Sequence, residues 1–297
     1  MRVLLAQLDP APGDPGANAA TIAATLADHP EAQLAVFPEL FLTGYDLERV
    51  LALALVPPDA ATAAGDAVAA ARAPRAADPF ATICEAARRH RTALLVGFPE
   101  LTIDGGVANA LACIDADGRH VATYRKANLF AAEAAAFVAG DELLVVELAG
   151  HRIGLLTCFD VEFPEPARLL ARAGAQLLVT VAANMEPYGP DHALAARARA
   201  LDNRLPHVYV NRVGSEAGLR FVGGSAVLAP DGSPIAQLDR DAGAAGTEAP
   251  GSAAAAVRVV EIPLGVAAKP QVNYLEHLRD DLVAKVVSSP SVTGGTP

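Results

Sequence analysis

The sequence predicts an α/β fold, and three observations support this class. Short apolar runs rich in Val, Leu and Ile have the length of strands. Longer Ala-rich segments with scattered arginines alternate with these runs and have the length of helices. Asp-Gly pairs between apolar runs are typical of antiparallel hairpins, so we expect a mixed sheet.

The elements follow from these patterns in chain order. The expected strands are Val3–Leu8, Leu34–Phe37, Ala93–Phe98, Leu143–Leu148, Ile153–Thr157, Gln176–Val181 and Val208–Val210. The expected helices are Asn18–Ala27, Pro79–His90, Pro164–Ala173 and His192–Asn203. The expected hairpin turns are Ile103–Gly106, Ala116–Arg119 and Pro230–Ser233, the second of which joins the runs Leu111–Ile114 and His120–Tyr124 as an antiparallel pair.

The domain organisation is predicted to be simple. We find no internal repeat and no break in composition that would mark a linker, so one domain is expected over residues 1–287. The segment Asp239–Ala256 is rich in Gly, Ala and Pro and is interpreted as a mobile surface loop. Residues 288–297 form a Ser, Gly, Pro and Thr tail that we expect to be disordered.

Charge and hydropathy exclude several classes of protein. The 297 residues include 34 acidic and 23 basic side chains, a formal net charge of −11. This acidic balance argues against binding to nucleic acid, which needs a basic face, and against binding to an anionic membrane. The N-terminal run meets Asp9 and Pro10 too soon for a signal peptide, and no apolar run reaches the roughly 18 residues of a transmembrane helix.

The cysteines and histidines show no metal-ligand spacing. Cys84, Cys113 and Cys158 form no CxxC pair, so we expect neither a disulfide framework nor a zinc or iron–sulfur site, and a cytoplasmic location fits. Cys84 and Cys113 are interpreted as core residues, and the seven histidines as structural. Because no dinucleotide or phosphate-binding glycine motif occurs either, no cofactor is predicted.

Three reactive side chains stand at the ends of strand-like runs. Glu39 follows an apolar strand, where burial would raise its pKa and make it a usable base. Lys126 ends another run, from which an ammonium can face a developing oxyanion. Cys158 stands at a strand-to-helix turn, where a thiol can act as a nucleophile. Each taken alone has a plain alternative: a solvent-facing Glu, a surface Lys and a small buried Cys.

Taken in this order, the three segments resemble the motifs of a known family. The segments resemble the Glu, Lys and Cys motifs of the nitrilase superfamily of carbon–nitrogen hydrolases. They are, in that order, Phe37-Pro38-Glu39, Tyr124-Arg125-Lys126 and Leu156-Thr157-Cys158-Phe159-Asp160. The resemblance extends from Val3 to about Leu282. It implies an α-β-β-α four-layer sandwich that forms a homodimer, or a higher homo-oligomer, through helices near the cysteine.

The resemblance also implies a role for each site residue. Cys158 is similar to the family's nucleophile, Glu39 to its general base and Lys126 to its oxyanion stabiliser. Glu133 resembles a second family glutamate, which would orient Lys126 and the leaving group. The backbone N–H of Phe159 would be the second oxyanion donor. Together these roles imply hydrolysis of a carboxamide through a thioester, with release of ammonia.

Within this family, the sequence is similar to the amidase branch that includes 5-aminopentanamidase and R-stereoselective amidases. The similarity lies in three segments: Phe37–Tyr45, Phe159–Glu165 and Ala182–Tyr188. This similarity implies a small aliphatic or amine-bearing amide as the substrate, with Tyr45, Glu162, Asn184 and Met185 at the binding site. Glu162 stands where branches that bind a substrate carboxylate place Arg, which counts against acidic substrates. The alternative is that Glu162 points elsewhere, into a salt bridge.

Two other functions stay open at this point. A nitrilase or an N-carbamoyl-amine hydrolase would use the same three side chains, and the motifs do not separate them from an amidase. A non-catalytic scaffold is the third hypothesis. The presence of Glu39, Lys126, Cys158 and Glu133 counts against it, because an idle protein has no chemical need for all four.

Overall fold

The computed structural model describes residues 1–58, 78–240, 255–264 and 274–275. The predicted tail at 288–297 lies outside the described residues, as does most of the predicted loop, over 241–254. At its C-terminal end that loop prediction was wrong, because Ala256 begins a strand that pairs with the N-terminal strand. The prediction of a single domain over residues 1–287 stays a prediction.

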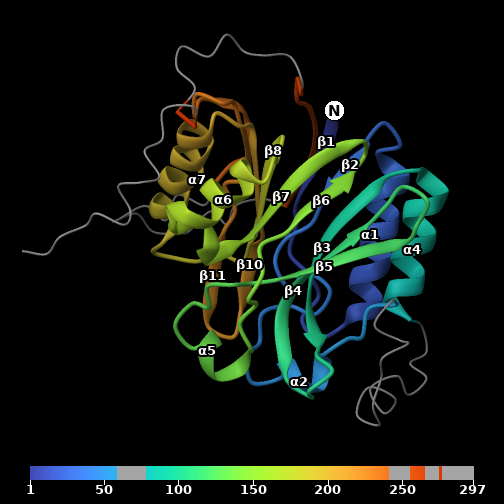
Figure 1. Cartoon of the computed structure of the whole chain (residues 1–297). Helices are drawn as coiled ribbons and strands as arrows, with labels where there is room; N and C mark the ends of the chain where they lie inside the picture. The colour runs from blue at the N-terminus through green and yellow to red at the C-terminus, as the bar shows by residue number, and fades with distance from the viewer. Residues whose placement is uncertain (59–77, 241–254, 265–273, 276–297) are drawn as a thin grey trace, which may run out of the picture.

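Within the described residues, the strands form two six-stranded sheets and a two-stranded ribbon (Figure 1). The first sheet has the order β14 (Ala256–Glu261), β1 (Arg2–Gln7), β2 (Leu34–Val36), β3 (Ala93–Leu101), β4 (Val107–Ile114) and β5 (His120–Arg125). The second has the order β13 (Pro234–Gln237), β12 (Ala226–Leu228), β9 (His207–Asn211), β8 (Leu177–Ala182), β7 (His151–Thr157) and β6 (Val145–Leu148). The ribbon consists of β10 (Val213–Glu216) and β11 (Leu219–Val222).

Both sheets are mixed, as the hairpin signals predicted, and both are built in the same way. β1, β2 and β3 run parallel at the centre of the first sheet, and β7, β8 and β9 do so in the second. Antiparallel strands flank each parallel trio. The parallel strands of one sheet therefore end at a common edge, which is where α/β proteins place their binding sites.

Two of the longer helices begin at a capping aspartate. The longer ones are α1 (Pro15–Asp28), α4 (Pro79–His90), α6 (Pro164–Arg172) and α7 (Gly189–Asn203), and the short ones are α2 (Val50–Leu53) and α5 (Glu133–Ala136). Asp14 and Asp78 cap α1 and α4, because each side chain accepts a hydrogen bond from a backbone N–H of the first turn. Proline lies in the first turn of all four longer helices, where its missing N–H costs nothing.

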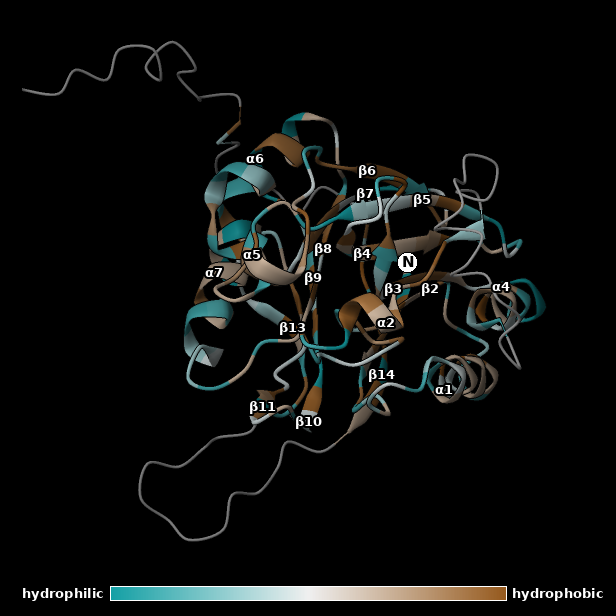
Figure 2. Cartoon of the chain, turned by 90° about the horizontal axis from the view of Figure 1, so that it is seen from below, coloured by the Kyte–Doolittle hydropathy of each residue, from teal (hydrophilic) through white to brown (hydrophobic). Residues whose placement is uncertain are grey.

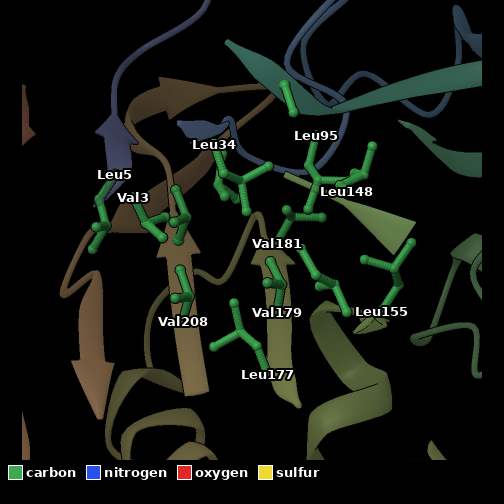
Figure 3. Close-up of a cluster of buried hydrophobic side chains, with 14 of the residues drawn as sticks. Val3, Leu5, Leu34, Leu95, Leu148, Leu155, Leu177, Val179, Val181 and Val208 are labelled. Carbon is green, nitrogen blue, oxygen red and sulfur yellow. The ribbon is translucent and has the colours of Figure 1, made fainter. Parts of the chain in front are cut away.

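The core has two kinds of interface. Between the sheets, alternate side chains of both parallel trios pack against one another, among them Val3, Leu5, Leu95, Val179 and Val208 (Figure 3). The opposite face of the first sheet packs on α1 and α4, and that of the second on α6 and α7 (Figure 1). Hydrophilic residues are frequent on the outer helices α4 and α7 (Figure 2). The result is the expected α-β-β-α arrangement.

The strand and helix predictions were confirmed with shifts of a few residues, and α4 matches its predicted bounds. The prediction missed the short helices α2 and α5, the ribbon β10–β11 and the edge strand β14. The ribbon β10–β11 was missed, since its strands are short and contain Gly214 and Glu216 in place of an apolar run. The edge strand β14 was missed because it follows a Gly- and Ala-rich segment.

Gly97 brings β3 into close contact with the segment that carries Glu39. A Cβ atom on residue 97 would lie 2.5 Å from the Pro38 carbonyl oxygen and 2.6 Å from the Glu39 Cα, and it would also clash with the Leu40 nitrogen. These atoms belong to backbone, which cannot move aside as a flexible side chain can. The close approach therefore requires glycine at this position of β3.

We predict that Gly97→Ala destabilises the protein by about 1–3 kcal/mol, the usual range for overpacking a core. Urea unfolding monitored by circular dichroism measures this loss. Gly16→Ala is the matched control, since its new Cβ meets only the Asp14 side chain at 3.5 Å in the first turn of α1. A Gly97→Ala protein as stable as the Gly16→Ala protein would contradict the close packing.

Candidate active site

Three strand ends bring the predicted reactive residues into one region. Lys126 directly follows β5, Cys158 directly follows β7, and Glu39 lies shortly after β2. Lys126 and Glu39 therefore come from the first sheet and Cys158 from the second. All three side chains are buried. The region thus lies where the two sheets of the sandwich meet, at the ends of their parallel strands.

The ammonium of Lys126 contacts two carboxylates. Its Nζ atom lies 2.9 Å from Glu39 Oε1, and 2.9 and 2.7 Å from the two oxygens of Glu133. The side chains of all three residues have no solvent exposure. Two carboxylates around one ammonium leave a net negative charge in a buried site, which further hydrogen-bond donors must offset.

Four donors supply this compensation. Asn109 Nδ2 lies 2.7 Å from Glu39 Oε1 and 3.3 Å from Glu133 Oε1. The Ala183 backbone N–H donates to Glu39 Oε2 at 2.7 Å. The Tyr45 hydroxyl donates to Glu133 Oε1 at 2.8 Å, and the Phe130 backbone N–H to Glu133 Oε2 at 2.7 Å. Hydrogen bonds to ionised acceptors are stronger than neutral ones, so they hold both carboxylates in place.

The electrostatics of the cluster follow from burial and charge. Burial on its own lowers the pKa of Lys126, but Glu39, Cys158 and Glu133 outweigh it and raise the pKa above its ordinary value. Burial also raises the pKa of Glu133, and the neighbouring Lys126 ammonium acts in the opposite direction. Lys126 is therefore a fixed positive charge at neutral pH.

Cys158 begins a single turn of 3-10 helix, η2 (Cys158–Glu162), which separates β7 from α6. Its φ angle of 48° lies in the left-handed region, which non-glycine residues rarely adopt. Asp160 holds this turn, since it accepts hydrogen bonds from the Thr157 backbone at 3.0 Å and from the Tyr124 hydroxyl at 2.7 Å. Its other oxygen accepts from the backbone and the side chain of Asn128.

The surroundings of the Cys158 thiol favour its protonated form. Burial raises its pKa most, and Glu39 raises it further, while Lys126 and the Ala183 N–H lower it. The pKa lies well above its ordinary value on balance. A thiol in this state becomes a nucleophile only when a neighbouring base takes its proton.

The residues predicted to bind substrate have different surroundings. Tyr45 is buried and contacts Glu133, so it belongs to the charged cluster. Asn184 and Met185 follow β8 directly after Ala183, and Met185 packs in an apolar cluster that includes Tyr45 and Phe221. Glu162 Oε1 lies 3.1 Å from His192 Nε2. Glu162 therefore contacts a side chain of α7, and its predicted role in substrate binding stays a prediction.

A group of aromatic rings adjoins the Cys158 turn. Phe159, directly after Cys158, packs edge-to-face with Phe130 at 5.3 Å and with Phe163 at 4.9 Å between ring centroids. Phe130 also packs on Tyr188 at 5.3 Å. Phe130 and Phe159 are half-buried, and Tyr188 is exposed. These rings therefore join the segments that carry Glu133, Cys158 and Asn184.

Sequence reasoning missed Asn109 and gave no role to Asp160. Asn109 lies in the middle of β4, where its sequence neighbours suggest only a strand. Asp160 was part of the quoted cysteine motif, and its position next to a turn was a usable signal. The core interpretation was confirmed for Cys113, which is fully buried, whereas Cys84 is half-buried at the edge of the α1–α4 cluster.

The described part of the chain holds no group of three or more His, Cys, Asp or Glu side chains arranged to bind a metal ion. It also contains no helix with the length and apolar character needed to cross a bilayer.

We predict that Lys126→Met destabilises the protein by roughly 3–5 kcal/mol at neutral pH, because it leaves two buried carboxylates without their cation. The pKa of Glu133, already raised in the folded chain, rises further above its unfolded value once the ammonium is lost. Such a group makes the folded state more stable as the pH falls, so the loss shrinks between about pH 8 and about pH 5. Urea unfolding of the wild-type and Lys126→Met proteins at both pH values measures this loss of stability.

Arg88→Met is the control for this experiment, since Arg88 pairs with Glu85 on the exposed surface of α4. Its removal is expected to change stability little at either pH. A Lys126→Met protein whose stability does not depend on pH more steeply than that of the Arg88→Met protein would contradict the charge balance described above.

Comparisons with known proteins agree with this geometry. The model of the carbon–nitrogen hydrolase family matches residues 2–265. The hydrolase in the pqqF 5′ region of Pseudomonas protegens is 41% identical, over 81% of this chain and 80% of that protein. An (R)-stereoselective amidase from a Pseudomonas species is 34% identical, over 81% of this chain and 82% of its own length.

A solved structure adds a chemical observation about a relative. An amidase from Nesterenkonia sp. AN1 is similar to this chain with a TM-score of 0.77 and 28% sequence identity, over 97% of both chains. In that variant of the amidase, the acetamide moiety of fluoroacetamide is added covalently at the active-site cysteine. The matches in sequence, fold and motif order lead to one conclusion: this chain belongs to the carbon–nitrogen hydrolase family, also called the nitrilase superfamily, and is of the amidase type.

Proposed function

We propose that this protein hydrolyses small carboxamides to a carboxylate and ammonia through a thioester on Cys158. The observation that carries the proposal is the fully buried contact of Lys126 with Glu39 and Glu133, beside a cysteine on a strained turn. A buried cluster of charges is costly to the fold, and a purely structural role does not require it. Catalysis of acyl transfer does require such a cluster, because it needs a base and a fixed positive charge beside the nucleophile.

The first half of the proposed reaction forms the thioester. Glu39 takes the proton of the Cys158 thiol, and the sulfur attacks the amide carbonyl carbon. Lys126 and the Phe159 backbone N–H stabilise the resulting oxyanion, an effect of roughly 100- to 1000-fold in rate for one donor. Glu133 orients Lys126 and the leaving group. When the C–N bond breaks, Glu39 returns its proton to the nitrogen, and ammonia leaves.

The second half releases the acid. Glu39 takes a proton from a water molecule, which attacks the thioester carbonyl carbon. Lys126 again stabilises the oxyanion. The C–S bond breaks, the product leaves as a carboxylic acid that gives its proton to the released ammonia in solution, and the proton held by Glu39 returns to the sulfur of Cys158. Atoms and charge balance over the cycle, and no cofactor is required.

The substrate class rests on the relatives and on the residues around the site. The (R)-stereoselective amidase and the Nesterenkonia amidase both carry an amidase name, and structures of the latter include a complex with butyramide. We propose a small aliphatic or amine-bearing carboxamide here, with Asn184 and Met185 beside its acyl group. Tyr45 supports this site through Glu133.

The proposal extends to the assembly and the cellular location. We propose a homodimer formed through α6 and α7, supported by the exposed Leu169 and Leu194 on these helices. Three free cysteines support a cytoplasmic location, where thiols stay reduced.

We predict that Cys158→Ala and Glu39→Gln abolish ammonia release and leave the circular dichroism spectrum unchanged. The substrate panel consists of butyramide, 5-aminopentanamide, glutaramate, an N-carbamoyl amine and a nitrile. Turnover of the first two compounds by the wild-type protein supports the proposal. Turnover of only the carbamoyl compound or the nitrile would overturn the substrate class, and full activity of Cys158→Ala would overturn the mechanism.

Asn109→Asp tests the charge balance without changing the shape of the side chain. The new carboxyl would face Glu39 and Glu133 where Asn109 now donates to both. We predict a loss of at least about tenfold in kcat/KM, equivalent to about 1.4 kcal/mol. Asn203→Asp is the control, because Asn203 is a buried amide at the end of α7, where it bonds to Arg199. Equal losses in both variants would contradict a specific role for Asn109.

A further inference from the structure

A row of hydrogen-bonded polar side chains, called the polar chain below, contacts the Cys158 turn, and the mechanism above does not use it. Glu162, the last residue of η2, contacts His192 Nε2 at 3.1 Å. The other ring nitrogen, Nδ1, lies 2.9 Å from the Tyr209 hydroxyl. The Asn184 side chain adjoins the Tyr209 hydroxyl, and its Nδ2 also donates to the Tyr188 carbonyl oxygen at 3.3 Å. His192 and Tyr209 are buried, and Glu162 is half-buried.

The partners determine the direction of these hydrogen bonds. An ionised carboxylate can only accept, so His192 Nε2 must carry the proton that Glu162 binds. In a neutral imidazole, Nδ1 is then an acceptor, and the Tyr209 hydroxyl donates to it. The Tyr209 oxygen is left to accept from the Asn184 amide. Every group in the chain has a partner of the right kind, which makes its arrangement specific.

Both ends of this chain reach the catalytic cluster. At one end, Glu162 belongs to the same turn as Cys158. At the other end, Asn184 directly follows Ala183, whose N–H binds Glu39 and also faces the Cys158 thiol. In the middle, Tyr209 packs in one apolar cluster with Cys158. The chain therefore links the proposed nucleophile to the segment that holds the proposed base.

Helix α7 makes one more contact with the same turn. Arg199 Nε donates to the Val161 carbonyl oxygen at 3.2 Å, one residue before Glu162. The turn is thus held at two places. Asp160 binds it to Tyr124 and Asn128, and the C-terminal end of the turn, at Glu162, contacts α7. A residue in left-handed conformation persists only where such contacts fix it, as they do for Cys158.

We propose that His192 is a positioning residue, which joins Glu162 to Tyr209 and thereby fixes the Cys158 thiol relative to Glu39. The inference rests on the proposed function. It gives Glu162 a role in this chain and not in the recognition of a substrate amine. Misplacing a reacting group by about 1 Å costs about 100-fold in rate, so loss of the chain lowers kcat more than it changes KM.

The test compares variants that remove hydrogen bonds and keep volume. His192→Phe, Tyr209→Phe and Glu162→Leu are each expected to lower kcat by about 10- to 100-fold on pentanamide and on 5-aminopentanamide alike, with little change in KM. The double variant His192→Phe/Tyr209→Phe is expected to lose no more than the worse single variant, because both break one chain. Glu162→Gln keeps an acceptor oxygen and is expected to recover most of the kcat that Glu162→Leu loses.

His207→Phe is the matched control. His207 is buried, bonds to Thr180 at 2.8 Å and to the Ala196 carbonyl oxygen at 3.0 Å, and so also joins β9 to α7. It makes none of the contacts to the Cys158 turn described above. Urea unfolding compares the stability of all variants. The proposal is overturned if His192→Phe loses no more kcat than an equally destabilised His207→Phe, or if Glu162→Gln raises KM for the amine-bearing amide alone.

A second measurement separates this inference from the proposed function. Alkylation of Cys158 by iodoacetamide, followed by mass spectrometry, reports thiol activation without any substrate. Slower alkylation in His192→Phe than in His207→Phe supports the positioning chain even if the wild-type protein hydrolyses no amide in the panel. Equal alkylation rates would overturn the chain, whatever the substrate proves to be.

Discussion

The buried contact of one ammonium with two carboxylates is the constraint on which the rest of the site depends. Lys126, Glu39 and Glu133 have lost all contact with solvent, and each charge would be costly without the others. The excess negative charge is offset by donors from four segments, among them Asn109 and Tyr45. Removing any one partner changes the balance of charge and hydrogen bonds around the others, so the cluster behaves as a unit.

The fold makes this cluster possible through its strand ends. Each sheet has a parallel trio at its centre, and packing of the two trios buries the region where β2, β5 and β7 end. The first sheet contributes both members of the Glu39–Lys126 pair, and the second contributes Cys158. The core between the sheets therefore brings these strand ends together, and η2 with its contacts to α7 positions the thiol.

Much of this could be predicted from local sequence. The strands of both parallel trios are short apolar runs, and α4 is bounded by Asp78 and by basic residues, so their patterns suffice. Glu39, Lys126 and Cys158 could be singled out because each follows such a run closely, but their predicted roles came from the resemblance of the three motifs to one family. The ribbon β10–β11 could not, because polar and glycine residues interrupt its alternation, and its stability comes from contacts elsewhere, such as that of Glu216 with Tyr45.

The sequence by itself determined the class of fold, the order of the motifs and the chemical types of the reacting groups, since these depend on neighbours along the chain. Only the tertiary structure decided the partners. Asn109 reaches Glu39 across 70 residues, and Tyr45 reaches Glu133 across 88. The choice of His192 as the partner of Glu162 depends on how α7 packs against η2. Such contacts arise when sheets and helices pack together, and no local pattern encodes them.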